Sequence, residues 1–239
     1  MIFNHVGFGL GKRRLPIIEQ YTAPDGVRFY NTPSGLKYPS ITTILAEKSR
    51  DVINQWRNRV GHETANTISR VAAGRGTALH KMAEDYLNNK TVESSSPLVA
   101  DLWSKVRPVL DNNINNIHCQ ETKLFSHHLR LAGTVDCIAE YNGKLSIIDF
   151  KTSTGNKRKD WITSYFMQCA AYAIMYEEIA FMPITQLVII VGVEEEPEPQ
   201  VFIEKRDNWT TELLHWRDHY EDKHKLVYGM ENAALTLPV

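Results

Sequence analysis

The chain has 239 residues, and its 43% hydrophobic and 23% charged residues are ordinary globular usage. This composition excludes a disordered chain, a collagen-like chain and a small disulfide-stapled scaffold. Lys and Arg number 27 against 28 Asp and Glu, so the net charge of −1 gives no bulk basic balance that would indicate nucleic acid. No run of about 18 apolar residues predicts a membrane span.

The three cysteines, Cys119, Cys137 and Cys169, form no CxxC pair. Their odd number predicts neither a disulfide framework nor a four-cysteine metal site, and a reducing compartment fits. The first residues lack the apolar core of a secretory signal. We therefore expect the cytoplasm of a bacterium or of a phage-infected cell, with the mitochondrial matrix as the alternative.

The first half of the chain is mainly helical in pattern. A short β segment at 27–30 and a turn at 33–35 precede a helix for which Ser40 is a plausible N-cap. Helical periodicity follows over 51–73, with Gly61 as an interruption, and again over 77–87 and 98–113.

The second half changes to strand periodicity. Strands are expected at 120–126, 129–141, 144–152, 186–193 and 200–205, with helices at 161–179 and 208–228. This order predicts an α/β fold in which a central mixed β-sheet is flanked by helices, with a helical N-terminal part at about 40–113. No linker divides the chain, so a single domain over 1–239 is expected, with its core at about 118–228.

One predicted hairpin brings charged residues together. Asn142-Gly143 is a strong type I′ turn signal, and counting back from it places Asp136 opposite Asp149. Opposite residues share a face, and Lys151 lies on the same face two residues on. Two like charges in an apolar strand pair are unfavourable unless one of them is protonated or a cation joins them, and carboxylates suit Mg²⁺, for which Mn²⁺ often substitutes. The alternative is a simple Asp–Lys ion pair near a strand end.

Three polar residues on predicted helices add to this constellation. His80 lies beside the apolar stripe of its helix, where it could bind a metal or simply be a hydrogen-bonded boundary histidine. Gln168 and Tyr172 are one turn apart on a helix that is apolar nearly all round. They could support an active site or make a polar contact in the core.

Four motifs, in order, resemble the RecB-like branch of the PD-(D/E)XK nuclease superfamily. They are GRGTALH at 74–80, LAGTVD at 131–136, IIDFKTS at 147–153 and QCAAY at 168–172. The segments 30–45 and 137–153 also resemble exonucleases of the mitochondrial genome maintenance group and similar phage and bacterial proteins.

The resemblance implies a role for each matching residue. Asp136 and Asp149 match metal-binding acids, Lys151 the catalytic lysine, and His80 a histidine that helps to hold the metal. The carbonyl of Phe150 would be a further metal ligand. The supporting or DNA-binding positions that it implies are Gln168, Tyr172, Glu121, Thr152 and Ser153.

The resemblance further implies a Mg²⁺-dependent exonuclease that acts on single-stranded DNA from a free end, in replication, repair or recombination. The cysteines cannot supply the iron–sulfur cluster of some relatives, and no GxxxxGK[ST] motif predicts a nucleotide cofactor. A helicase acting with this chain would be a separate protein. The alternatives are a structure-specific endonuclease on the same core and an inactive nucleic-acid-binding module.

Two segments could meet DNA. Residues 48–81 carry seven basic and two acidic side chains, and Lys157-Arg158-Lys159 follows the DxK strand, although a solvated loop is equally expected there. Trp56, Tyr86 and Trp161 could stack on bases, but core packing is favoured for each.

Overall fold

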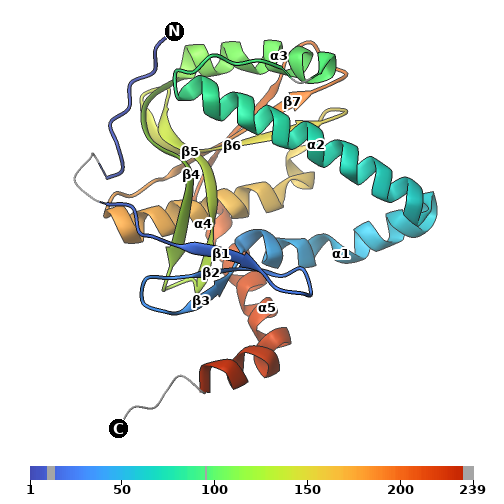
Figure 1. The fold of residues 1–239 in the computed structure, drawn as a ribbon, viewed down its shortest axis with the longest axis vertical. Coiled ribbons are helices and arrows are strands. Elements are labelled where there is room, and N and C mark those ends of the chain that lie inside the picture. The colour runs from blue at the N-terminus through green and yellow to red at the C-terminus, as the bar shows by residue number, and fades with distance from the viewer. Residues whose placement is uncertain (10–13, 95, 234–239) are drawn as a thin grey trace.

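A computed structural model describes residues 1–9, 14–94 and 96–233 and shows a mixed β-sheet between helical layers (Figure 1). The helices are α1 (Ile41–Val60), α2 (His62–Leu87), α3 (Pro97–Asn113), α4 (Thr163–Ala180) and α5 (Asp207–Ala233), with a short 3-10 turn η1 (Lys159–Trp161) before α4. The main strands are β4 (Ile114–Ser126), β5 (Leu131–Tyr141), β6 (Lys144–Ser153), β7 (Gln186–Val193) and β8 (Gln200–Lys205). None of the helices in the described ranges is long and apolar enough to cross a membrane.

The five main strands lie in the order β4-β5-β6-β7-β8. β6 and β7 are parallel and joined through α4, whereas the other neighbours are antiparallel, so the sheet is mixed as predicted. A smaller antiparallel sheet, which contains the expected β segment near 27–30, is formed by β1 (Glu19–Thr22), β2 (Arg28–Asn31) and β3 (Lys37–Pro39).

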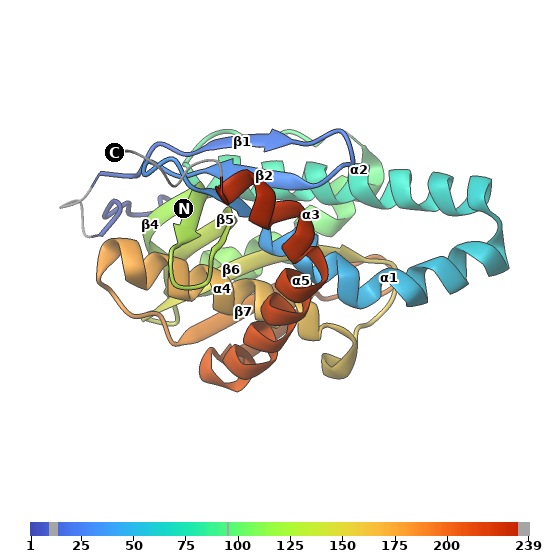
Figure 2. The same ribbon diagram turned by 90° about the horizontal axis from the view of Figure 1, so that it is seen from below.

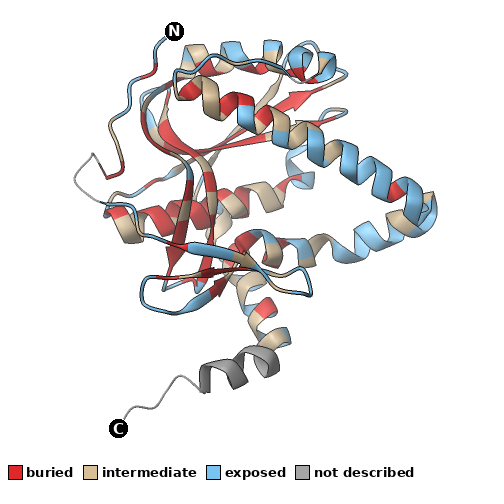
Figure 3. Ribbon diagram, in the orientation of Figure 1, coloured by how far each residue is buried: buried red, intermediate tan, exposed pale blue. Residues whose placement is uncertain are grey.

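The sheet buries both faces, as the unbroken apolar sequence of β7 requires. Leu187 and Ile189 belong to the core shared with α4, α1 and α5, while Val188 and Ile190 belong to the core shared with α2 and α3. Figure 3 shows β5, β6 and β7 largely buried, and α4 buried over much of its length. Gly192 is part of this packing, since a Cβ there would lie 3.3 Å from Leu79 Cδ2.

The α1 and α2 helices project sideways from the sheet, a shape visible in two views (Figure 1, Figure 2). We call residues 41–87 the helical arm. Gly61, with a φ of +88°, separates the two helices, as expected for an interruption at that residue. The N-terminal half of the chain is thus mainly helical, as the sequence indicated.

Of two local predictions in this region, the N-cap position of Ser40 is confirmed without its side-chain cap, and a helix boundary is wrong. Ser40 stands at the N-cap position of α1, but its hydroxyl contacts Thr42 Oγ1 at 2.8 Å and caps no backbone N–H. The helix predicted over 77–87 begins at His62, because Gly74 and Gly76 lie inside α2. A glycine in a helix costs only about 1 kcal/mol, which the packing of α2 against the sheet offsets.

Candidate active site

The predicted hairpin forms with the predicted register. Asn142 and Gly143 both have positive φ, and the pairs run from Tyr141–Lys144 to Cys137–Ile148. The ladder ends there, one step before Asp136 and Asp149, so the expected direct pairing of these two aspartates is wrong. β5 separates from β6 at this point, and the Asp136 carboxylate accepts a hydrogen bond of 2.9 Å from the Phe150 N–H. The two aspartates therefore lie where two strands diverge.

Asp136 faces α2. Its carboxylate oxygen lies 3.4 Å from His80 Nδ1, on the part of α2 that packs against β6. Glu121 of β4 completes a group in which one ligand atom from each of His80, Glu121 and Asp136 lies within 4.8 Å of the others. Glu121 has a φ of +45°, a conformation that non-glycine residues rarely adopt and that is frequent at functional sites.

The electrostatics of this cluster favour a cation. Although Glu121 is exposed as a residue, partial burial of its carboxyl group and the neighbouring charge of Asp136 raise its pKa to about 7. A divalent cation would relieve this repulsion, and one imidazole with two carboxylates is a donor set that Mg²⁺ or Mn²⁺ accepts. An open hollow of about 520 Å³ adjoins the cluster and is lined by His80, Glu121 and α2 residues from Ala73 to Glu84.

Asp149 makes a different contact. It is 1% exposed, and its carboxylate pairs with Lys151 Nζ at 2.5 Å. Among the described residues neither of its oxygens has a hydrogen bond of good geometry. Burial raises the pKa of Asp149, and Lys151 opposes this rise. A buried carboxylate whose Oδ1 has no hydrogen bond among the described residues fits a metal ligand, because such groups are otherwise satisfied.

Lys151 is held on the α4 side of the sheet. Its ammonium lies 5.1 Å from the centre of the Tyr165 ring. Burial lowers the pKa of Lys151, but Asp149 and Asp136 more than offset this, so its pKa is raised and the side chain carries a positive charge at neutral pH. Lys151 can therefore stabilise negative charge on a phosphate without first gaining a proton.

Gln168 and Tyr172 support the site from α4. Gln168 Nε2 donates to Tyr172 Oη over 3.2 Å, and Tyr172 packs against Gly133 of the same strand as Asp136. A Cβ at Gly133 would lie 2.7 Å from Tyr172 Cε1, so this contact requires glycine. The GxxD and QxxxY motifs are thus in contact through Gly133 of the first and Tyr172 of the second.

The remaining predicted residues are less directly placed. Thr152 Oγ1 accepts a hydrogen bond of 3.1 Å from Arg75 Nε, and Ser153 is buried, with its hydroxyl donating to the Gly155 carbonyl at 2.6 Å. Among the predicted basic residues, Arg158 pairs with Asp160 and Lys159 with Glu204. The structure therefore commits the Ser153 hydroxyl to a turn rather than presenting it to a substrate.

Two contacts were missed by the sequence analysis. Arg75 forms an ion pair with Glu194 besides its bond to Thr152, and Tyr165 lies under Lys151. Arg75 belongs to the GRGTALH motif, so its position gave a signal, whereas nothing in the sequence marked Tyr165. The expectation of core packing for Trp161 is wrong, since this residue is 63% exposed.

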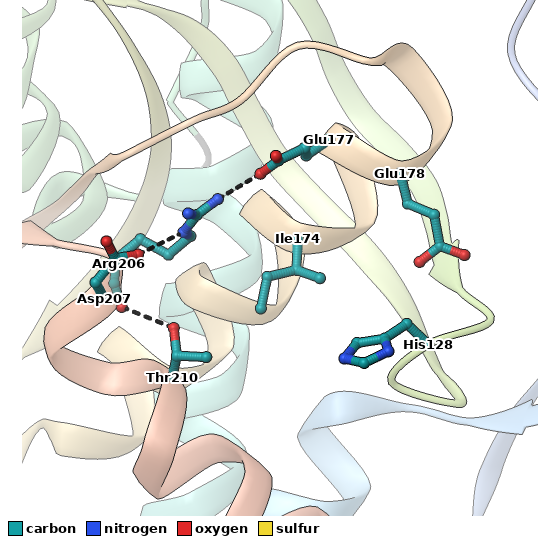
Figure 4. Close-up of a pocket in the computed structure, with 7 residues that line it drawn as sticks. All are labelled: His128, Ile174, Glu177, Glu178, Arg206, Asp207 and Thr210. Carbon is teal, nitrogen blue, oxygen red and sulfur yellow. Dashed lines mark hydrogen bonds and ion pairs between the residues drawn. The ribbon is translucent and has the colours of Figure 1, made fainter.

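A second hollow, of about 540 Å³, lies away from these residues (Figure 4). Its arginine and carboxylate side chains are already engaged, because Arg206 pairs with Glu177 and Asp207, and Glu178 accepts bonds from Ser126 and from the His127 N–H. None of the predicted site residues lines it. The chemistry-bearing cluster described above thus lies elsewhere, at the diverging end of β5 and β6.

Comparison with known protein families matches residues 98–233 to the PD-(D/E)XK nuclease superfamily. The chain belongs to this superfamily. The matched range includes Asp136, Asp149, Lys151, Gln168 and Tyr172, and it leaves the helical arm with His80 outside. The resemblance drawn from the four motifs is confirmed at this level.

Curated relatives extend the match into the helical arm. The chain is similar to mitochondrial genome maintenance exonuclease 1 of Homo sapiens, with 24% identity over 77% of this chain and 59% of the relative. The identity is 26% for the proteins of Xenopus tropicalis, over 78% and 59%, and of Mus musculus, over 82% and 62%. This PD-(D/E)XK chain therefore spans about three fifths of the length of those relatives.

Proposed function

We propose that this protein is a Mg²⁺-dependent DNA exonuclease that hydrolyses the phosphodiester bonds of single-stranded DNA from a free end. The observation that carries the proposal is the convergence of His80, Glu121 and Asp136 beside the buried Asp149–Lys151 pair. A module that only binds DNA gains nothing from acids that repel phosphate. The names of the curated relatives favour an exonuclease.

His80, Asp136, Asp149 and the Phe150 carbonyl would hold the cation, with Glu121 as a further acid. A bound Mg²⁺ supplies a nucleophilic water and polarises the scissile phosphate. The Phe150 N–H fixes the orientation of Asp136, and Asp149 fixes Lys151. The Lys151 ammonium stabilises the charge that develops on the phosphate, and Gln168 and Tyr172 keep the strand of Asp136 in place.

We also propose the wider setting. The whole chain acts as one nuclease domain, its role lies in DNA replication, repair or recombination, and any helicase that acts with it is a separate protein. Thr152, whose hydroxyl lies at the end of β6 beside Arg75, contacts the DNA backbone, and Ser153 shapes the turn that follows. A bacterial or phage-infected cytoplasm is the expected location, with the mitochondrial matrix as the alternative.

The test is cleavage of end-labelled linear single-stranded DNA in Mg²⁺. We compare the wild type with Lys151→Ala and, as a matched control on the same strand, Lys144→Ala, whose side chain is exposed at the hairpin turn. The wild type and Lys144→Ala should degrade the strand, and Lys151→Ala should be slower by about 100-fold or more. EDTA should abolish cleavage, and Mn²⁺ should restore it.

Two outcomes would contradict the proposal. Cleavage of a closed circular strand at the rate of the linear strand would favour an endonuclease on the same core. Binding of DNA without cleavage in Mg²⁺ and in Mn²⁺ would favour an inactive binding module.

A further inference from the structure

The segment that joins β6 to α4, residues 154–162, carries an exposed aromatic side chain next to the candidate active site. Trp161 is 63% exposed, although a tryptophan side chain in a globular protein is normally largely buried. The guanidinium carbon of Arg158 lies 5.5 Å from the centre of its ring. The catalytic scheme proposed above uses neither residue.

This segment is fixed to its surroundings by polar contacts. The Gln200 side chain accepts from the Lys157 N–H at 2.6 Å and donates to the Lys157 carbonyl at 3.1 Å. Lys159 pairs with Glu204, and Asn156 donates to Glu196 at 2.6 Å. The backbone that presents Trp161 is therefore held before any ligand arrives, which reduces the entropy lost on binding.

Arg158 is oriented in the same way. Its Nε and Nη2 donate to the two carboxylate oxygens of Asp160, and each hydrogen bond is 3.0 Å long. This bidentate pair occupies Nε and Nη2, holds the planar guanidinium near the indole ring, and leaves the Nη1 group as the donor for a phosphate. An aromatic ring flanked by arginine is the combination that binds unpaired bases together with their phosphates.

Trp161 lies close along the chain to the residue that contacts Lys151. Trp161 ends η1, four residues before Tyr165 near the start of α4. The Tyr165 N–H bonds the Ile162 carbonyl at 2.9 Å, and the Tyr165 ring lies under Lys151. Lys48 of the helical arm donates to Thr163 Oγ1 at 2.7 Å between them. A strand whose phosphate reached Lys151 would therefore pass close to Trp161.

We propose that Trp161 and Arg158 form a base-stacking subsite for single-stranded DNA, an inference that rests on the proposed nuclease function and names a substrate contact of that site. Trp161 stacks on one base of the strand, and Arg158 contacts the adjoining phosphate. The subsite holds unpaired DNA, whose bases expose their faces, and discriminates against a duplex, whose bases are stacked on each other.

The test measures binding of a fluorescein-labelled oligothymidine in EDTA, which prevents cleavage. Trp161→Ala should weaken binding by roughly 10- to 100-fold, the loss typical of one stacked base, and Trp161→Phe should recover part of it. Neither variant should change binding of a matched oligonucleotide that lacks bases. Phe181→Ala serves as the control, because Phe181 is 70% exposed at the other end of α4.

Cleavage in Mg²⁺ gives an independent readout. Trp161→Ala should raise KM and leave kcat unchanged at saturating DNA, because stacking holds the strand and takes no part in the chemistry. If the wild type cuts DNA but Trp161→Ala binds oligothymidine as tightly as the wild type does, the stacking subsite is wrong and the nuclease function stands. If the wild type neither binds nor cuts, both proposals fail.

Discussion

Two regions of the molecule differ in how far their side chains are buried: the central sheet together with α4, and the helical arm. Ten residues of α4 are buried, including Tyr172 and Tyr176. In the arm, α1 buries only Ile41, Ile44 and Leu45, all in its first turns. The far part of the arm exposes Val52 and Ile53 of α1 and Ile68 and Val71 of α2. Figure 3 shows this change along the arm.

The difference shows where this chain keeps its charges. The sheet holds Asp149 and Lys151 in an apolar setting. Charges there are unfavourable for folding, but their electrostatic interactions with a substrate are stronger than in water. The arm carries the basic side chains of Arg50, Arg59, Arg70 and Lys81 in solvent, where they stabilise the fold little and remain available to a polyanion. Substitutions in the sheet should therefore change stability and chemistry, whereas substitutions in the arm should change DNA binding and leave stability almost unchanged.

The largest effect is expected for the buried pair. Lys151→Met leaves the Asp149 carboxylate buried without its cation, so the free energy of unfolding should fall by about 3–5 kcal/mol. Replacing both residues, as in Asp149→Leu with Lys151→Met, should recover that loss or add about 1–4 kcal/mol, while cleavage stays absent. Urea denaturation without metal measures both variants. A double variant less stable than Lys151→Met alone would contradict this account.

A pair of glycines gives a matched comparison between sheet and arm. Gly133→Ala places a Cβ 2.7 Å from Tyr172 Cε1 and should destabilise the protein by about 1–3 kcal/mol. Gly74→Ala, in the exposed part of α2 with nothing within 4 Å of its Cβ, should stabilise the protein by about 0.5–1 kcal/mol. Thermal unfolding of both variants checks the signs. Equal effects would mean that Tyr172 is free to move.

The arm should affect DNA binding without affecting folding. Arg59 and Arg70 are exposed on α1 and α2, and replacing both with Ala should change the free energy of unfolding by less than about 0.5 kcal/mol. Affinity for single-stranded DNA should fall, and the slope of log K against log salt should become shallower by roughly 0.7 per lost phosphate contact. Replacing Lys144 and Lys205, exposed near the other end of the sheet, is the control. An unchanged slope in the arm variant would exclude the arm from the DNA interface.

The smallest effect concerns the ion pairs between arm and α5. Glu47 lies 3.1 Å from Lys223 Nζ and 3.2 Å from His224 Nε2. Partial burial raises the pKa of Glu47, but these two partners outweigh it, so the pKa is lowered overall. A lowered folded-state pKa stabilises the protein above the unfolded pKa, and this stabilisation is lost as the pH falls through the folded pKa. Glu47→Gln should therefore cost up to about 1 kcal/mol at pH 7 and nothing at pH 2. A cost that persists in acid would indicate lost packing.

Periodicity and turn chemistry predicted much of this structure. The hairpin at Asn142-Gly143 formed in the expected register because a type I′ turn fixes the pairing of both strands. The α2 boundary was wrong because Gly74 and Gly76 are weak local signals that the contact between α2 and β6 overrides. The exposure of Trp161 could not be predicted, because the residues around it fit a turn and do not indicate whether another element packs over that turn.

The sequence alone determined the mixed α/β class, the order of the main strands along the chain and the register of the hairpin, which holds as far as Cys137–Ile148, one step short of Asp136 and Asp149. Only the tertiary structure decided which partner each acid has. β5 leaves β6 just beyond Cys137, so Asp136 turns toward His80 and Glu121 while Asp149 stays buried with Lys151. The physical reason is that hydrophobic pattern and turn type act locally, whereas the divergence of two strands depends on the helices packed against both faces of the sheet.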